Sequence, residues 1–207
     1  FMRVMAFCKR LIYASKKGGI VLQEIELIVN VQRGDIKAFE ELFELYKYKA
    51  LRTVYLMTGD KDVSEDIVQE VFVLCYTSIK GLKKVEHFKT WFYRILTRTT
   101  WRYMKKEKRL IPVEHIFEKL EDNYTQSSLE KLEQKETAEF LYQEILKLQP
   151  KLQTTLILYY YNQFSVKEIA EVMNCLEGTV KSRLYTGRRK LKTNLIKYED
   201  FIIPKEV

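Results

Sequence analysis

Long stretches without a helix-breaking residue are the main feature of this 207-residue sequence, which contains only seven glycines and three prolines. The stretch from Phe88 to Arg109 has neither residue and is long enough for about six helical turns. Folds rich in short strands need many glycine- and proline-containing turns, so this composition disfavours a sheet-rich fold. We therefore predict an all-α fold, and the chain length favours two small helical domains.

Apolar spacing and turn residues place the helices of the first domain. Residues 22–57 carry apolar side chains at helical spacing, and a break at 34–35 divides them into two helices. Residues 58–60 form the next break. Asp62, followed three residues later by Glu65, predicts a capping box that opens a third helix.

A turn-rich segment separates this region from the second domain. Residues 111–112 end the long helix, and the acidic stretch 114–128 follows as a flexible linker. Helical spacing covers 129–148, and after Pro150 we expect two further helices and a short final one that ends near Tyr198. The expected organisation is an N-terminal extension over 1–21, a first domain over 22–110, an acidic linker over 111–133 and a helix-turn-helix domain over 134–203.

Charge is distributed unevenly along the chain, whose formal net charge is +8. Residues 80–109 include eleven basic and two acidic side chains, and residues 178–197 include seven basic and no acidic ones. Between them, residues 114–144 hold nine acidic and three basic side chains. Two cationic surfaces joined by an acidic tether predict two contacts on one polyanion.

A helix-turn-helix pattern begins at Ser165. A short helix buries Ile169, Ala170 and Met173, a turn covers 174–177, and a second helix starts near Gly178 with Thr179 as its cap. The N-terminal half of such a second helix meets base edges in duplex DNA. The candidate DNA-reading residues are Thr179, Lys181, Ser182, Arg183, Tyr185, Thr186, Arg188 and Arg189, and Arg189, Lys190 and Lys192 would reach phosphates. The alternative is an ordinary three-helix bundle with a solvated basic face.

The helix from Phe88 carries two separable stripes. Phe92, Ile95, Leu96, Thr99 and Tyr103 form the expected core face, and Trp91, Arg94, Arg98, Trp101 and Lys105 recur at three and four residues beside it. Alternating aromatic and cationic groups suit single-stranded DNA, because cations track phosphates while unstacked bases stack on rings. The alternative is that both tryptophans belong to the core.

The helix from Asp62 has an acidic face instead. Asp62, Asp66, Gln69 and Glu70 lie along its polar side and would meet a basic protein surface, unless the face is merely solvated. Asp62 and Asp66 could hold Mg²⁺ only with a third acidic ligand, which the pattern does not supply.

The sequence argues against catalysis. It has two histidines, no glycine-rich phosphate loop and no nucleophile motif, so we expect no enzymatic activity, no cofactor, no metal and no small-molecule substrate. An enzyme that acts on nucleic acid is therefore an alternative that the sequence disfavours.

Cysteine usage bears on the compartment. Cys8, Cys75 and Cys175 fit neither a disulfide framework nor a zinc site, and no apolar run has the ~20 residues needed to span a bilayer. We expect a cytoplasmic protein. Because Phe1 precedes Met2, the 1–21 extension is expected to be a remnant or a mis-set start rather than a working part.

Three motifs, taken in order, resemble those of the extracytoplasmic-function sigma factors of the sigma-70 family. They are Asp62-Val-Ser-Glu-Asp-Ile-Val-Gln-Glu-Val-Phe, then Phe88-Lys-Thr-Trp-Phe-Tyr-Arg-Ile-Leu, then Phe164-Ser-Val-Lys-Glu-Ile-Ala with Gly178-Thr-Val-Lys-Ser-Arg-Leu. The resemblance implies a factor that binds RNA polymerase core, recognises the minus-thirty-five and minus-ten promoter elements and promotes DNA opening. A stand-alone helix-turn-helix regulator is the alternative.

The resemblance also assigns partners. It implies that the Asp66, Gln69 and Glu70 face docks on the β′ clamp helices, that the 79–87 loop and the next helix engage the minus-ten element during DNA opening, and that the last domain binds the β flap and the minus-thirty-five element. The minus-ten and DNA-opening residues that it implies are Lys83, Lys84, His87, Trp91, Arg94, Arg98, Trp101, Arg102 and Lys105. The linker would thread toward the RNA exit path. An anti-sigma factor, often membrane-tethered, would restrain the protein, which would be a monomer when free and associate with the nucleoid when active. Arg98, Arg102 and Thr186 depart from the family pattern, so promoter specificity is expected to differ.

Overall fold

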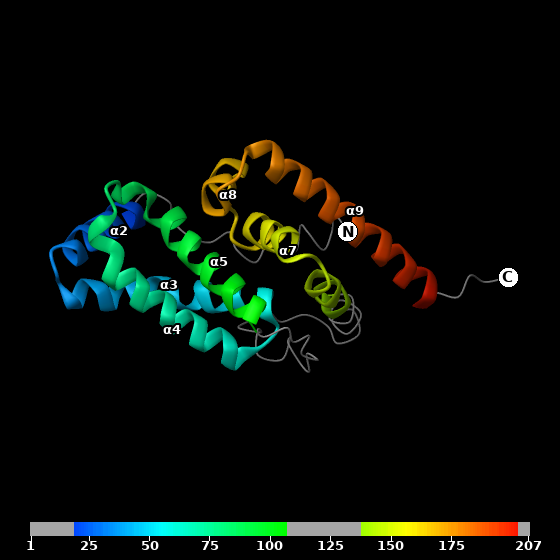
Figure 1. Cartoon of the computed structure of the whole chain (residues 1–207), viewed down its shortest axis with the longest axis horizontal. Coiled ribbons are helices and arrows are strands. Elements are labelled where there is room, and N and C mark those ends of the chain that lie inside the picture. Colours follow the sequence, from blue (N-terminus) through cyan, green and yellow to red (C-terminus); the bar gives the residue numbers. More distant parts are fainter. Residues whose placement is uncertain (1–18, 107–137, 203–207) are drawn as a thin grey trace.

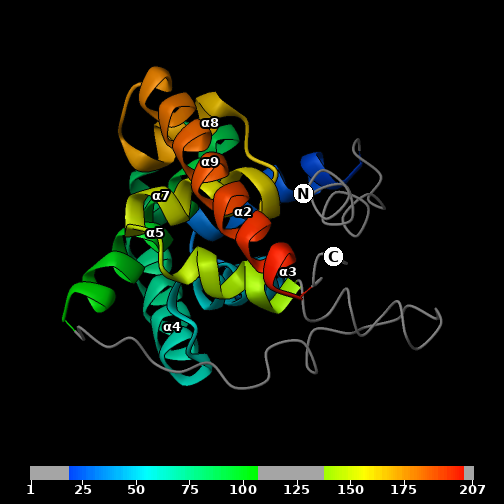
Figure 2. The same ribbon diagram turned by 90° about the vertical axis from the view of Figure 1, so that its right-hand side faces the viewer.

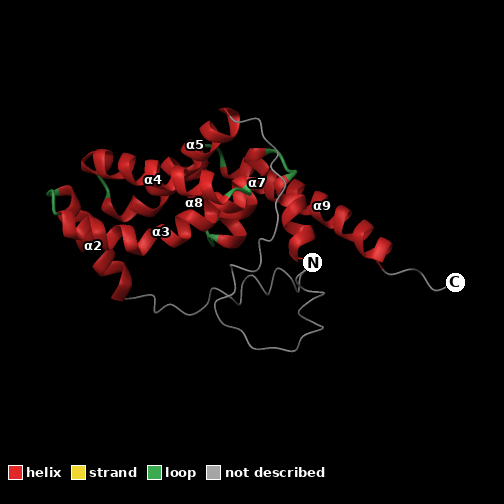
Figure 3. Cartoon of the chain, turned by 90° about the horizontal axis from the view of Figure 1, so that it is seen from below, coloured by secondary structure: helices red, strands yellow, loops and turns green. Residues whose placement is uncertain are grey.

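The protein is described by a computed structural model over residues 19–106, called the N-terminal half below, and residues 138–202, called the C-terminal half. Within these ranges all regular structure is helical, which confirms the predicted all-α class (Figures 1 and 3). The predicted linker and most of the predicted N-terminal extension lie outside the described residues. Among the described residues, no helix combines the length and the hydropathy that crossing a bilayer requires.

The N-terminal half contains four α-helices and a short connector. These are α2 (Gly19–Gln32), α3 (Ile36–Thr58), α4 (Lys61–Ser78), the 3-10 turns η1 (Ile79–Gly81) and η2 (Val85–His87), and α5 (Phe88–Lys106). The predicted break between the first two helices is confirmed: Gly34 adopts a φ of +95°, and the Asp35 side chain caps α3. Gly59 ends α3 with a φ of 74°, a conformation that glycine adopts without a steric penalty.

The start of α4 differs from the prediction. Asp60 is the N-cap, and its side chain accepts a hydrogen bond from the Val63 backbone N–H at 2.9 Å. The helix therefore begins at Lys61, two residues before the helical start that an Asp62–Glu65 capping box would give. Asp62 lies in the first turn, where a carboxylate still interacts favourably with the helix dipole.

The C-terminal half begins with a helical segment over 138–146. It continues with α7 (Pro150–Leu156), a π-helical turn η3 (Ile157–Tyr161), α8 (Val166–Met173) and α9 (Glu177–Ile202). Pro150 occupies the first turn of α7, where its missing N–H costs nothing. The predicted short final helix is wrong. The second helix of the helix-turn-helix continues through that region, and the two form one continuous helix of 26 residues, α9.

Aromatic rings fill the centre of the N-terminal half. Phe92 of α5 is fully buried and contacts Tyr46 of α3, Phe72 of α4 and Phe88, with ring centroids 5.1 to 5.9 Å apart. Large rings at these separations bury much apolar surface and prefer tilted or edge-on contacts. The expected core face of the Phe88 helix is confirmed at Phe92, Leu96 and Thr99, which are buried.

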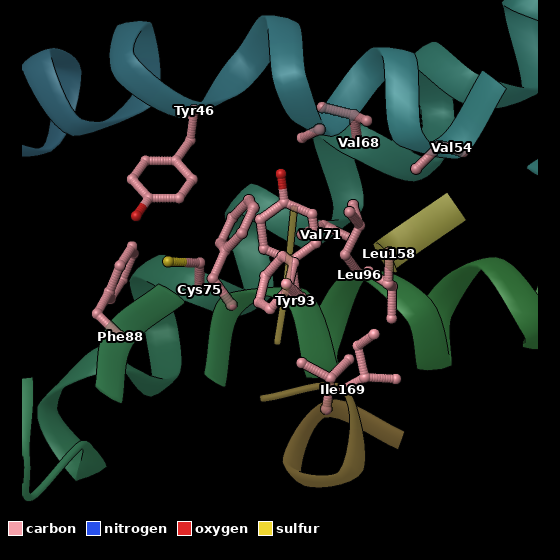
Figure 4. Packing of buried hydrophobic residues seen from close by; sticks show 14 of the residues in the cluster. Tyr46, Val54, Val68, Val71, Cys75, Phe88, Tyr93, Leu96, Leu158 and Ile169 are labelled. Atoms are coloured by element: carbon pink, nitrogen blue, oxygen red, sulfur yellow. The ribbon is translucent and has the colours of Figure 1, made fainter. Parts of the chain in front are cut away.

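The two halves share one hydrophobic cluster. Tyr93 and Leu96 of α5 lie between the α3–α4 layer and the C-terminal half, where Leu158 and Ile169 meet them (Figure 4). Helix α8 packs on α5, and α7 packs on both α3 and α9 (Figures 1 and 2). The chain therefore brings the two predicted domains into direct contact, an arrangement that the sequence patterns did not predict.

Candidate polymerase and nucleic-acid interfaces

The acidic face of α4 is largely open to solvent. Asp62, Asp66 and Gln69 are exposed, whereas Glu70 is half-buried and forms an ion pair with Arg102 of α5. The acidic face of α4 continues to Val73, which is 62% exposed, whereas valine is among the residues most often buried. The face thus offers charge at its N-terminal end and apolar surface further along.

The connector between α4 and α5 is held from α2. The Gln32 side-chain amide donates hydrogen bonds to the carbonyls of Ile79 at 2.9 Å and Leu82 at 2.8 Å. Lys83, Lys84 and His87 are exposed on this connector. Sequence reasoning missed Gln32, because a glutamine near a helix end carries no local signal for a partner 47 residues away.

The aromatic and cationic stripe of α5 is divided between solvent and the C-terminal half. Arg98 and Lys105 are exposed, as is Arg102 beside them. Trp91 is half-buried against Phe88, with ring centroids 5.7 Å apart.

Two members of the stripe bind the C-terminal half. Arg94 donates to the Glu171 carbonyl of α8 through Nε at 3.1 Å and Nη2 at 2.7 Å. The Trp101 indole N–H donates to the Thr154 hydroxyl of α7 at 3.0 Å. The indole is half-buried in this contact. The expectation that Trp101 shares an open face with the cations is therefore not met in this conformation.

Tyr93 is a second residue that the sequence patterns missed. It is buried, its ring lies 4.9 Å from that of Phe164, and its hydroxyl accepts a hydrogen bond from the Asn162 amide at 3.1 Å. Burial raises the pKa of the Tyr93 phenol, so it stays neutral at physiological pH. Tyr93 lies one position before Arg94 and marks the side of α5 that the C-terminal half covers.

The helix-turn-helix is formed as predicted in its first helix. Ser165 caps α8 and forms a capping box with Glu168, and Ile169, Ala170 and Met173 are buried. Asn174 ends the helix in the left-handed region with a φ of 49°, which an asparagine tolerates better than most residues.

The second helix starts one residue earlier than predicted. Because α9 begins at Glu177, Thr179 lies inside its first turn and is not the cap. Lys181, Ser182, Tyr185 and Arg189 are exposed, and the half-buried Thr186 lies on the helix between them.

Two of the predicted DNA-reading arginines are half-buried. The Arg183 guanidinium lies 3.7 Å from Cys175 Sγ, and that of Arg188 lies over the rings of Tyr159 and Tyr160 at 5.6 and 5.7 Å. Arg188 therefore packs on the π-helical turn instead of pointing fully outward. Such cation–π contacts fix a guanidinium in place.

The described residues contain no cluster of three or more metal-ligating side chains.

Comparison with protein-family models matched both halves of the chain. Residues 42–110 match the model described as "Sigma-70 region 2", and residues 138–191 match "Sigma-70, region 4". The first match covers α4, the connector and α5, and the second covers the helix-turn-helix.

Curated relatives match over most of their length. The chain is 32% identical to the ECF RNA polymerase sigma factor SigW of Bacillus subtilis, over 81% of this chain and 94% of that protein. It is 29% identical to the ECF RNA polymerase sigma-E factor of Haemophilus influenzae, over 84% of this chain and 96% of that protein.

Solved structures share the fold. A structure of CnrH in complex with the cytosolic domain of CnrY aligns with a TM-score of 0.64 at 18% identity, over 84% of this chain and 98% of that one. The sigma factor RpoE of Bartonella quintana, crystallised with the anti-sigma factor NepR, aligns with a TM-score of 0.62 at 20% identity, over 78% of this chain and 98% of that one.

Proposed function

Because this chain belongs to the sigma-70 family as an extracytoplasmic-function sigma factor, which binds RNA polymerase core and recognises promoters, we propose how its own residues divide that work. The exposed acidic face of α4, formed by Asp62, Asp66 and Gln69, docks on the β′ clamp of the polymerase. Opposite charge on the two surfaces would speed the encounter and fix its register. Glu70 joins this contact after it exchanges its ion pair with Arg102 for one with the polymerase.

The connector and α5 form the surface for the minus-ten element. Lys83, Lys84 and His87 are exposed beside the start of α5, and Arg98 and Lys105 continue the cationic path along it. Cations at this spacing would hold the phosphates of an opened strand, and Trp91 and Trp101 would receive unstacked bases. Gln32 is a positioning residue here, because it holds the connector through two carbonyls.

The second helix of the helix-turn-helix reads the minus-thirty-five element. Lys181, Ser182 and Tyr185 are exposed on the N-terminal part of α9, the part that enters a major groove in this motif. Arg183 reaches a base edge by leaving its sulfur contacts, and Arg189 meets phosphates. The same half would contact the β flap.

An anti-sigma factor is the proposed regulator. The Bartonella RpoE was crystallised with the anti-sigma factor NepR, and it shares this fold. CnrH, which also shares the fold, was solved in complex with the cytosolic domain of CnrY. Sigma factors are non-enzymatic initiation factors, and we propose that the present chain likewise catalyses no reaction. It would act in the cytoplasm on nucleoid DNA, or be held at the membrane by its anti-sigma factor.

The observation that carries the proposal is that two separate cationic surfaces and one acidic surface lie on the elements matched by regions 2 and 4. Run-off transcription on fragmented genomic DNA, with core polymerase and the purified chain, tests it. Discrete new transcripts that need both components are the expected result. Binding to duplex DNA without any core-dependent transcript would favour the stand-alone regulator instead.

A further inference from the structure

The carboxylates on the acidic face of α4 differ in whether the protein itself neutralises them. Asp62 and Asp66 are exposed and form no ion pair within the described ranges. Glu70, on the same face, forms an ion pair with Arg102 of α5. A basic partner surface would therefore meet two open charges and one charge that is already compensated.

Two neighbouring side chains of α5 hold Glu70. Helices α4 and α5 lie side by side, and the Arg102 guanidinium donates through Nη2 to a Glu70 carboxylate oxygen (Figure 1). The same guanidinium lies 5.7 Å from the centroid of the Tyr103 ring. The Tyr103 hydroxyl also donates to Glu70, and this hydrogen bond, more than burial, raises the pKa of the phenol. The Glu70 carboxylate is therefore drawn toward α5.

The two partners of Glu70 have different electrostatic effects. The phenol orients the carboxylate but leaves its negative charge in place, whereas the guanidinium compensates that charge. A basic group of a protein partner would have to displace Arg102 before it could form its own ion pair with Glu70. Arg102, which the sequence patterns assigned to DNA, thus also lies at the edge of the surface proposed for the polymerase.

We propose that Arg102 is an intramolecular competitor of RNA polymerase for Glu70, and that it lowers the affinity of this chain for the core enzyme. Core binding breaks the Glu70–Arg102 pair, so the stability of that pair is subtracted from the stability of the complex. The competition is a property of this chain, because Arg102 departs from the family pattern. The inference rests on the docking role proposed for the α4 face.

The size of the effect follows from the exposure of the pair. The side chains of Arg102 and Glu70 are 58% and 32% exposed, and water screens such pairs so that each contributes little. Removal of Arg102 should therefore raise the affinity for core about threefold. The gain should shrink at high salt, because dissolved ions screen an exposed pair further.

The test measures the affinity of the full chain for purified core polymerase by fluorescence anisotropy, without DNA, so that the DNA role of α5 does not enter. Arg102→Ala should bind about threefold more tightly than the parent. Arg102→Lys keeps a cation beside Glu70 and should bind as the parent does. The control Lys49→Ala removes the same charge from the exposed surface of α3, and its affinity should match the parent. A melting curve of each variant checks that the fold is intact.

A double-mutant cycle tests whether Arg102 acts through Glu70. In a Glu70→Gln background, Arg102→Ala should change the affinity no more than Lys49→Ala does, because the neutral amide gives a cation nothing to compete for. A gain that persists in this background would overturn the competition. Equal affinities of Arg102→Ala and Lys49→Ala in the parent background would overturn it as well.

Asp66→Lys separates failure of the competition from failure of the docking face. If Asp66→Lys weakens core binding while Arg102→Ala binds as Lys49→Ala does, the docking face stands and the competition is overturned. If neither Asp66→Lys nor Arg102→Ala changes the affinity, the docking face fails and the competition fails with it.

Discussion

Leu156 of α7 leaves no room for a side chain at Gly187 of α9. A β-carbon placed on Gly187 would lie 2.9 Å from Leu156 Cδ1 and 3.1 Å from its Cγ. Both residues are buried, so Leu156 has little freedom to move away. The glycine that interrupts the helical pattern of the recognition helix is therefore required for close packing of two helices, and this offsets its unfavourable helix propensity.

Gly187→Ala should destabilise the fold. Overpacking costs ~1–3 kcal/mol, whereas the gain in helix propensity is only ~1 kcal/mol, so the net loss should be about 1 kcal/mol in urea unfolding. Gly178→Ala is the matched control, because a β-carbon there meets nothing within 4 Å and should stabilise α9. If both changes stabilise the protein, the contact with Leu156 is too loose to matter.

Asp66→Lys should weaken binding to core polymerase. The carboxylate is exposed on α4, so its reversal should leave the melting temperature unchanged while placing like charge against the clamp. A loss of about tenfold in affinity is expected for a charge at such an interface. Glu40→Lys on α3 controls for net charge. Equal affinity for both variants in a fluorescence competition assay would place the docking surface elsewhere.

Arg183→Ala and Lys192→Ala should have different effects on the sequence specificity of DNA binding. Arg183 lies on the recognition face, and its loss should cost ~1–3 kcal/mol and relax the preference at one position of the minus-thirty-five element. Lys192 is exposed further along α9, so its loss should weaken all sequences alike and reduce the salt dependence. A binding assay over single-base variants of the promoter separates these effects. Sequence-blind losses from both changes would mean that Arg183 touches only phosphate.

The two described cysteines should differ sharply in reactivity. Cys75 is fully buried, and burial raises the pKa of its thiol to about 12, whereas Cys175 is partly exposed. At pH 8 only about one Cys75 in ten thousand would be thiolate, the reactive form. In a Cys8→Ser background, Ellman's reagent should therefore label Cys175 in the folded protein and Cys75 only after denaturant is added. Prompt release of two equivalents without denaturant would contradict this burial.

Local patterns were sufficient for most of the secondary structure. The breaks at Gly34 and Gly59, the start of α8 at Ser165 and the apolar spacing of α8 each depend on residues within four positions of one another. Their physical causes act inside one turn of chain, so they can be recognised in a sequence. The same holds for the cationic and acidic segments, since charge is a property of composition.

The sequence by itself determined the all-α class, the helix-turn-helix and the uneven charge that suggest DNA and polymerase as partners. Only the tertiary structure decided which side of α5 is open. Helical spacing places Arg94, Arg98 and Trp101 along one stripe, but contacts with residues 53 to 77 positions away cover two of them and leave Arg98 exposed. A helix face looks the same in sequence whether solvent or a second domain covers it, because the covering residues are distant in the chain and meet it through packing and hydrogen bonds that no local pattern encodes.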